Sequence, residues 1–341
     1  MGSDVPSILR RLFGAALLAV AIVPSAAVGQ RLDGFNVIAT PDHRFGSASA
    51  ALSLAQARRL GASAVAIVPF LWQPDPASPD IVRGADMPDD ELRAAIRQAH
   101  TAGFAVVVKP QVWVPERWAG LVEPNSEAAW QGWFARYGRA IAALARIAAE
   151  ERADVFAIGT ELEKTTRRAE WPDLIAAVRP LFPGTLTYFA HNADEAEAVA
   201  FWDKLDAIGV TLYPALGEDY DRIGRLLKME AEAARLDALA AHTGKSILVG
   251  EVGLRSADGA AVKPWESAEE RASPAAPLLQ AEVLGDWLGV LDRPAVRGVM
   301  IWRWFTDPRA GGSADTDFTV QGKPAEGVLY CMWTRRCRRP Q

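Results

Sequence analysis

Two glutamates stand at the ends of two apolar segments, and their positions suggest that they act as a pair. Residues 247–250 run directly into Glu251, and residues 155–160 run directly into Glu161. A carboxylate at the end of a buried strand is costly to bury unless it is used or paired. Two carboxylates that face one cleft can divide acid–base and nucleophilic chemistry between them. The sequence therefore predicts a catalytic pair, provided that the fold brings Glu161 and Glu251 together.

Eight apolar segments, each of which could be a strand, alternate with helix-like segments from Leu32 onward. Each is nearly continuous in hydrophobic residues, as parallel strands buried on both faces are. They span residues 34–38, 64–71, 104–108, 155–158, 185–189, 207–212, 247–250 and 298–301. Eight such units in about 250 residues predict an α/β protein with a single (β/α)8 barrel, the TIM barrel. A doubly wound open sheet is the alternative, although no Gly-x-Gly-x-x-Gly turn follows the first segment.

The helices between these strands are predicted from caps and apolar stripes. The clearest follows Ser126, where Trp130, Phe134, Tyr137 and Ile141 recur at steps of three and four. Another is expected over residues 194–205. Residues 255–277, rich in Ala, Ser and Pro, are expected to form an insertion above the barrel, and no helix is expected after the eighth strand.

The first 29 residues have the organisation of a secretory signal peptide. Arg10 and Arg11 precede a short apolar run at 12–23, and small residues follow at 25–29. The run is too short to cross a bilayer. We therefore expect removal of residues 1–29, export to the periplasm or the extracellular space, and no membrane contact afterwards. The paired arginines also permit the twin-arginine route, and a retained membrane anchor is the alternative.

The barrel is expected over residues 30–306 and a C-terminal tail over 307–341. The only two cysteines, Cys331 and Cys337, fall in that tail. In an oxidising compartment they could form a disulfide that pins it, and two free thiols are the alternative. The formal net charge is −5, so the composition offers no basic field for a nucleic acid partner.

In a (β/α)8 barrel the C-terminal ends of the strands converge on the face that carries the active site. The polar and aromatic residues at those ends are Asn36, Trp72, Lys109, Gln111, Trp113, Glu161, His191, Asn192, Tyr213, Glu251, Trp302 and Trp304. Two carboxylates surrounded by aromatic and hydrogen-bonding side chains fit glycoside hydrolysis. Tryptophan also packs its flat face against the C–H face of a sugar. The sequence therefore predicts a carbohydrate substrate.

At these residues the chain resembles the clan A retaining glycosidases, and most closely glycoside hydrolase family 113, which is known for β-1,4-mannanase activity. The resemblance covers residues 32–306. Its motifs are Ile158-Gly159-Thr160-Glu161-Leu162, Gly250-Glu251-Val252-Gly253 and Met300-Ile301-Trp302-Arg303-Trp304, supported by Lys109-Pro110. It implies a retaining hydrolase that cleaves β-linked, mannan-like poly- or oligosaccharides by double displacement.

The resemblance also implies a role for each matching residue. Glu161 would be the general acid/base and Glu251 the nucleophile. Tyr213 would hydrogen-bond Glu251, and Trp302 or Trp304 would form a sugar platform. The substrate-binding residues expected in all are Asn36, Trp72, Lys109, Trp113, Thr160, Asn192, Tyr213, Trp302 and Trp304. Such a mechanism needs the pKa of Glu161 raised, by burial and by the charge of Glu251.

One position departs from the clan. Much of the clan has asparagine before the acid/base, where its amide contacts the sugar 2-hydroxyl, and here Thr160 stands in its place. An exported carbohydrate-binding barrel that has lost turnover is therefore the alternative function. None of the four histidines is paired at metal-ligand spacing, so neither a metal nor another cofactor is expected. No Gly-x-Ser-x-Gly elbow supports a serine hydrolase.

Overall fold

The computed structural model describes Met1 and residues 31–337. The predicted signal peptide, residues 1–29, lies outside the described residues apart from Met1 and stays a prediction. From Arg31 onward the described residues belong to one compact unit.

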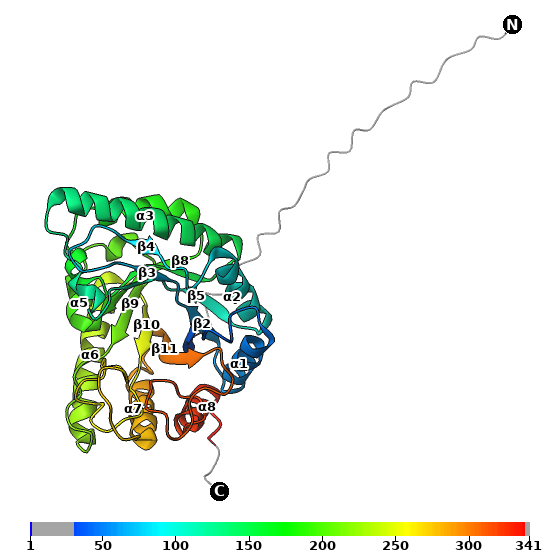
Figure 1. Ribbon diagram of the computed structural model, residues 1–341, viewed down its shortest axis with the longest axis vertical. Coiled ribbons are helices and arrows are strands. Elements are labelled where there is room, and N and C mark those ends of the chain that lie inside the picture. Colours follow the sequence, from blue (N-terminus) through cyan, green and yellow to red (C-terminus); the bar gives the residue numbers. More distant parts are fainter. Residues whose placement is uncertain (2–30, 338–341) are drawn as a thin grey trace. The chain divides into compact units, whose positions relative to one another are not determined.

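Eight parallel strands close into a barrel in which each strand pairs with the next along the chain and the last pairs with the first. They are β1 (Gly34–Ile38), β2 (Ala64–Ile67), β5 (Ala105–Val108), β7 (Val155–Thr160), β8 (Thr185–His191), β9 (Ile208–Leu212), β10 (Ile247–Val252) and β11 (Val296–Phe305). The α-helices lie outside the ring of strands (Figure 1). The predicted (β/α)8 barrel is confirmed.

The barrel interior and the layer between barrel and helices form two separate cores. In β2, Ala64 and Ala66 belong to the inner core, whereas Val65 and Ile67 belong to the outer one. This alternation follows from the two-residue period of a strand. Every strand of a closed barrel therefore has two buried faces, which is why its sequence is almost wholly apolar.

Helices follow the strands in chain order. The α-helices are α1 (Ala48–Arg59), α2 (Asp89–Thr101), α3 (Glu127–Glu150), α4 (Trp171–Val178), α5 (Asn192–Ala198), α6 (Arg222–Thr243), α7 (Pro277–Val290) and α8 (Ala325–Thr334). Short 3-10 helices cover Ala119–Leu121, Glu163–Thr165, Arg179–Leu181 and Trp202–Lys204. Ser126 caps α3 as expected, since its side chain accepts from the Ala129 amide. The helix expected at 194–205 begins and ends earlier, as α5, and its last part is the separate 3-10 turn at Trp202.

Proline divides one predicted strand and separates another from a short strand beyond it. The apolar segment 64–71 divides at Pro69 into β2 and β3 (Phe70–Trp72), and Pro110 separates β5, the strand predicted at 104–108, from β6 (Gln111–Trp113). Proline has no N–H to donate to the ladder of a sheet. Beyond the prolines, β3 pairs with β6 and with the short β4 (Val82–Arg83) in a small separate sheet near α3 (Figure 1).

The C-terminal region is more than a tail. Helix α8 follows β11 and packs against α7, so the eighth strand is followed by a helix like the others. The segment before α8 is also anchored, because the buried Lys323 ammonium donates to Ser256 Oγ at 2.7 Å and to Asp315 Oδ1 at 2.6 Å. The compact unit therefore continues past the boundary expected at residue 306.

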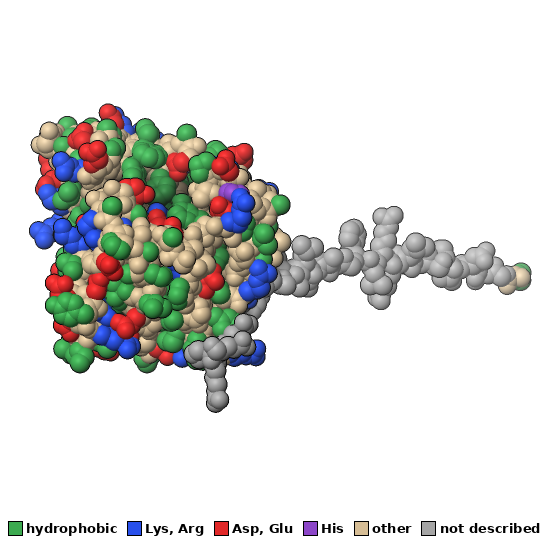
Figure 2. Space-filling model, turned by 60° about the horizontal axis from the view of Figure 1, so that its bottom comes forward, with side chains coloured by type: hydrophobic (Ala, Val, Ile, Leu, Met, Phe, Trp, Pro, Cys, Tyr) green, Lys and Arg blue, Asp and Glu red, His purple; other side chains and the backbone are tan. Residues whose placement is uncertain are grey.

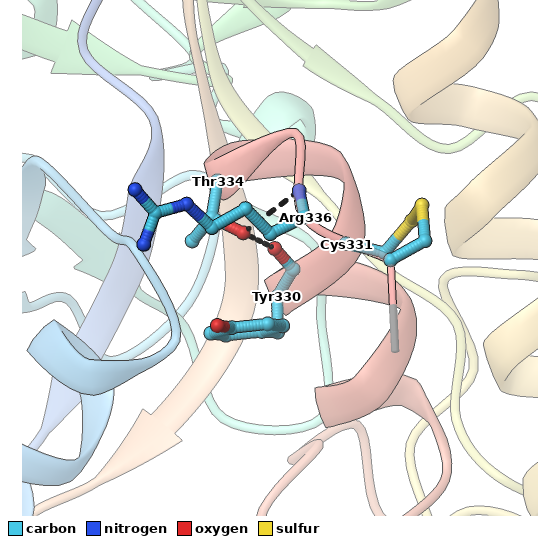
Figure 3. The surroundings of a disulfide bond; sticks show 5 residues. Tyr330, Cys331, Thr334 and Arg336 are labelled. Carbon is cyan, nitrogen blue, oxygen red and sulfur yellow. Dashed lines mark hydrogen bonds between the residues drawn. A yellow bond between two sulfur atoms is a disulfide. The ribbon is translucent and has the colours of Figure 1, made fainter. Parts of the chain in front are cut away.

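A disulfide joins Cys331 in α8 to Cys337, with Cα atoms 4.3 Å apart (Figure 3). Beside it, the Thr334 hydroxyl donates to the Tyr330 carbonyl oxygen at 2.6 Å and accepts from the Arg336 amide at 3.2 Å. The bridge and these bonds hold the chain where α8 ends.

The charged side chains on the face drawn in Figure 2 are interspersed, with acidic and basic groups side by side. Among the described residues, no helix has both the length and the hydropathy needed to cross a bilayer.

Candidate active site

Each of the three strands that carry the motifs has one extra residue relative to a neighbour. Between two successive paired positions, β7 contains three residue steps and its neighbour β8 only two. In the same way, β11 contains three steps and its neighbour β1 only two. Strand β10 has its extra residue at Gly250, directly before Glu251. A β-bulge re-aims the side chains that follow it, because one added residue exchanges the two faces of a strand. The bulges therefore set the direction of both glutamates and of the β11 tryptophans.

Glu161 follows β7 with a backbone φ of 53°, and its amide donates to the Phe189 carbonyl at 2.8 Å. Gly159, two residues earlier, lies against two tyrosines where there is no room for a side chain. A Cβ there would lie 2.9 Å from both Tyr137 Oη and the Tyr188 ring. The glycine of this motif is thus required by packing next to the carboxylate.

Three donors surround the Glu161 carboxylate, which is only 7% exposed. Thr211 Oγ1 donates to Oε1 at 2.5 Å, and Trp118 Nε1 donates to Oε2 at 2.9 Å. His191 Nδ1 lies 3.3 Å from Oε1. Thr211 and Trp118 were not among the expected site residues. Thr211 has a signal in the sequence, since it shares a strand face with Tyr213 two residues later, whereas Trp118 lies in a loop that gives none.

The expected rise in the pKa of Glu161 is wrong. Burial does raise this pKa, but the interaction with His191 and the hydrogen bonds from Thr211 and Trp118 outweigh it and lower the pKa to about 2. The surroundings of Glu161 therefore favour its carboxylate, and acid catalysis requires that it gain a proton.

The second glutamate, Glu251, ends the bulged part of β10 and is 3% exposed. The ammonium of Lys109, a fully buried side chain, donates to Oε1, and Tyr213 Oη donates to Oε2 at 3.0 Å. Lys109 Nζ also lies 5.4 Å from the centre of the Trp302 ring. The structure thus brings Lys109, Tyr213, Glu251 and Trp302 together, as the sequence predicted.

Burial raises the pKa of Glu251, and so does the nearby charge of Glu161, whereas Lys109 and Tyr213 act in the opposite direction. The two glutamates are thus close enough to influence each other's ionisation. They differ in their partners, since a buried cation contacts Glu251 and an imidazole faces Glu161.

Trp304 does not belong to this group. It is 1% exposed, its Nε1 donates to Ser53 Oγ of α1 at 2.7 Å, and its ring lies 4.7 Å from that of Phe35. The bulge in β11 explains the difference from Trp302, because the extra residue turns Trp304 toward the helices. Trp304 is a packing residue, and the expectation that it forms a sugar platform is wrong.

Asn36 and Thr160 are also engaged inside the protein. Asn36 is fully buried, and its amide donates to the Gly250 carbonyl oxygen at 2.8 Å. The Thr160 hydroxyl donates to the Pro110 carbonyl oxygen at 3.0 Å, so its hydrogen is not free for a sugar hydroxyl. In this structure both side chains use their donors to tie the tops of strands together.

Trp72 and Trp113 are exposed side by side on the small sheet. They are directly paired between β3 and β6, their exposed fractions are 39% and 49%, and their ring centres are 6.0 Å apart. An open cavity of about 410 Å³ adjoins Trp72 and is lined by Val82, Arg83, Gly84, Ala85 and Asp86. Both tryptophans are available to pack against a ligand.

A buried network under Glu161 and His191 involves two residues that the sequence did not suggest. Tyr188 Oη accepts from the Leu162 amide at 2.7 Å and donates to Glu195 Oε1 at 2.5 Å. The other oxygen of Glu195 accepts from the His191 amide at 2.5 Å. Burial raises the pKa of Glu195 to about 8. This network joins the backbone beside Glu161 to the backbone of His191.

The raised pKa of Glu195 predicts a pH-dependent stability. The folded protein holds this proton more tightly than the unfolded chain, so its contribution is complete below pH 4.5 and is lost as the pH rises toward 8. The loss is roughly 3 to 5 kcal/mol over that range. In Glu195→Gln, which does not titrate, urea denaturation should show a shallower fall in the free energy of unfolding between pH 5 and 8. Parallel curves for variant and wild type would contradict this assignment.

The comparisons with known proteins agree with this geometry. The Glycoside Hydrolase Family 113 profile matches residues 35–323. A β-mannanase of this family from Alicyclobacillus acidocaldarius superposes with a TM-score of 0.80 at 24% identity, over 91% of this chain and 99% of its own. A family 113 β-1,4-mannanase superposes with a TM-score of 0.79 at 25% identity, over 90% of this chain and 100% of its own. A Lactobacillus rhamnosus β-glucuronidase shares the fold, with a TM-score of 0.61 at 15% identity over 90% of this chain and 50% of that protein. No curated protein matches the chain.

The profile spans most of the chain, including both glutamates, the three motif strands and the segment that anchors α8. The protein therefore belongs to glycoside hydrolase family 113 and is a glycoside hydrolase.

Proposed function

We propose that this protein is a retaining β-mannanase that cleaves β-1,4-linked mannan or manno-oligosaccharides by double displacement. Glu251 is the nucleophile and Glu161 the general acid/base. The observation that carries the assignment is the difference between the two carboxylates. Glu251 lies against a buried ammonium and a phenol, which favour its carboxylate and fix its position, whereas Glu161 lies beside an imidazole with which it can exchange a proton.

In the first step a Glu251 oxygen attacks the anomeric carbon and forms an ester to the sugar. The glycosidic C–O bond breaks, and Glu161 gives a proton to the departing oxygen. In the second step Glu161 takes a proton from water as the water oxygen attacks the same carbon. The ester bond breaks and Glu251 leaves as a carboxylate, so the anomeric configuration is retained after two inversions.

The mannan assignment rests on the two family 113 structures that match along nearly their whole length, both of which are described as β-mannanases. Trp302, next to Lys109 and Glu251, is the sugar platform nearest the reacting carbon. Trp72 and Trp113 supply further aromatic surface for a longer chain. We also propose that the protein is exported, on the basis of the sequence of residues 1–29. Amino-terminal sequencing of the secreted protein would test this.

The test of the acid/base role uses substrates that differ in their leaving group. Glu161→Ala should lower kcat/KM on manno-oligosaccharides by roughly 10²- to 10⁴-fold, because a poor leaving group needs the proton. On a dinitrophenyl β-mannoside, whose leaving group needs none, glycosylation should be nearly unaffected. Added azide should then yield the β-mannosyl azide.

An equal loss on both substrates would remove Glu161 from this role. NMR of the first product formed by the wild type reads the stereochemistry, and an α-anomer would exclude retention. Binding of manno-oligosaccharides without turnover in the wild type would instead favour the non-hydrolytic barrel.

A further inference from the structure

The Glu161–His191 pair raises the question of where its proton resides. Oε1 and Nδ1 are 3.3 Å apart, so either group can hold a proton that the other then accepts as a hydrogen bond. General acid catalysis requires the proton on Glu161. If the imidazole takes it, the pair becomes an ion pair and Glu161 cannot protonate a leaving group.

The side chain of Asn192 is oriented by a bond that leaves no ambiguity. The Tyr213 amide donates to Asn192 Oδ1 at 2.8 Å, so this atom must be the amide oxygen. The amide nitrogen Nδ2 then lies 3.0 Å from His191 Nε2. An NH2 group can only donate, so Nε2 must accept with a lone pair. The imidazole that fits this contact is neutral and carries its hydrogen on Nδ1, toward Glu161.

The charges around the imidazole, in contrast, favour its protonation. Burial lowers the pKa of His191, but the Glu161 carboxylate, with Glu195 and Glu163, more than offsets this and raises it. Several other groups face the pair. Thr211 and Trp118 donate to Glu161, and Glu195 accepts from the His191 amide. Glu251 lies beyond Glu161, together with its partners Lys109 and Tyr213. The Asn192 amide is the contact among these that opposes a proton on Nε2.

We propose that Asn192 is a positioning residue that keeps His191 neutral, so that a proton taken up by the Glu161–His191 pair resides on Glu161. The inference rests on the proposed acid/base role of Glu161. It gives Asn192 a function through its neighbour, in place of the sugar contact expected from the sequence. Protonation at Nε2 would place a hydrogen against the amide hydrogens, whereas Glu161 can take the proton once the Thr211 hydroxyl turns to accept it.

The informative variant is Asn192→Asp. Asparagine and aspartate both tolerate the φ of 55° at this position, and an aspartate oxygen can still accept from the Tyr213 amide. Its second oxygen accepts a hydrogen from Nε2, so the variant stabilises the imidazolium and draws the proton away from Glu161. On manno-oligosaccharides kcat/KM should fall roughly 10- to 100-fold, a part of the full general-acid effect. On the dinitrophenyl mannoside it should change less than about 3-fold.

Asn192→Gly serves as the matched control, because it keeps a backbone suited to positive φ and removes both the amide and any replacement charge. Its loss on manno-oligosaccharides should be smaller than that of Asn192→Asp. A purely structural role for Asn192 predicts the reverse order, with glycine the more damaging, and equal losses on both substrates.

The ¹⁵N NMR signals of the imidazole give a readout that does not depend on turnover. The chain has four histidines, so the spectrum is assigned with a single His191→Gln variant. In the wild type at pH 7 we expect neutral His191 with hydrogen on Nδ1, and in Asn192→Asp an imidazolium. Hydrogen on Nε2 in the wild type at pH 7 would overturn the proposal. Loss of the proposed mannanase function would show separately, as a wild type without activity but with the same imidazole signals.

Discussion

Replacing Glu251 by alanine should lower kcat on manno-oligosaccharides by at least about 10⁴-fold, because the covalent intermediate can no longer form. The substrate should still bind, since Trp302, Trp72 and Trp113 are unchanged. Azide should restore cleavage of the dinitrophenyl β-mannoside and yield the α-azide, because it attacks the anomeric carbon directly. This anomer is opposite to the one expected from Glu161→Ala, so the pair of variants separates the two roles.

The matched control is Glu230→Gln, on helix α6, where the carboxylate forms a surface ion pair with Arg293. Its kinetics should equal those of the wild type. Glu251→Ala with more than a tenth of the wild-type kcat would show that the nucleophile is another group. A mass increase of one sugar on Glu251, after incubation with a 2-fluoro mannosyl fluoride, would identify it directly.

The second large effect is expected at Lys109, which is completely buried against Glu251. Lys109→Met keeps most of the volume and removes the charge, leaving a buried carboxylate without its cation. Breaking such a pair costs about 3–5 kcal/mol. Without the ammonium, the folded-state pKa of Glu251 rises further above its ordinary value. The free energy of unfolding of the variant should therefore be closest to wild type near pH 4 and fall as the pH rises.

A double-mutant cycle tests this explanation by urea denaturation at pH 7. In Lys109→Met with Glu251→Gln both charges are gone, so the double variant should be more stable than Lys109→Met alone. Additive losses would show that the ammonium and the carboxylate do not depend on each other. Lys109→Arg keeps the charge but needs more room, and should lie between the wild type and Lys109→Met in stability.

The fold and the pair of glutamates were predictable from the sequence because both depend on local pattern. A strand buried on two faces must be apolar throughout, so the eight barrel strands stand out one by one. Each glutamate follows such a strand, and in a parallel barrel strand ends share one face. Lys109, Tyr213 and Trp302 were placed correctly for the same reason, since each lies at or just beyond the end of an apolar segment.

The directions of side chains that follow a β-bulge were not predictable from the sequence in this way. Trp302 and Trp304 are two residues apart and should share a strand face. The extra residue in β11, recognised only from its pairing with β1, sends Trp304 into the outer core. Pro69 and Pro110 similarly end two strands, but only the tertiary structure shows that the chain resumes in a second sheet that exposes Trp72 and Trp113.

The ionisation of Glu161 was decided by tertiary structure alone. Burial and the charge of Glu251 could be anticipated, and both would raise its pKa. The groups that reverse the sign are Trp118, His191 and Thr211, which lie 43, 30 and 50 residues away along the chain. His191 and Thr211 approach Glu161 because β8 and β9 follow β7 in the sheet and their ends lie at one rim, and Trp118 reaches it from the segment after β6. The sequence by itself determined the fold and the two carboxylates, and the tertiary structure decided their hydrogen-bond partners and therefore their charge.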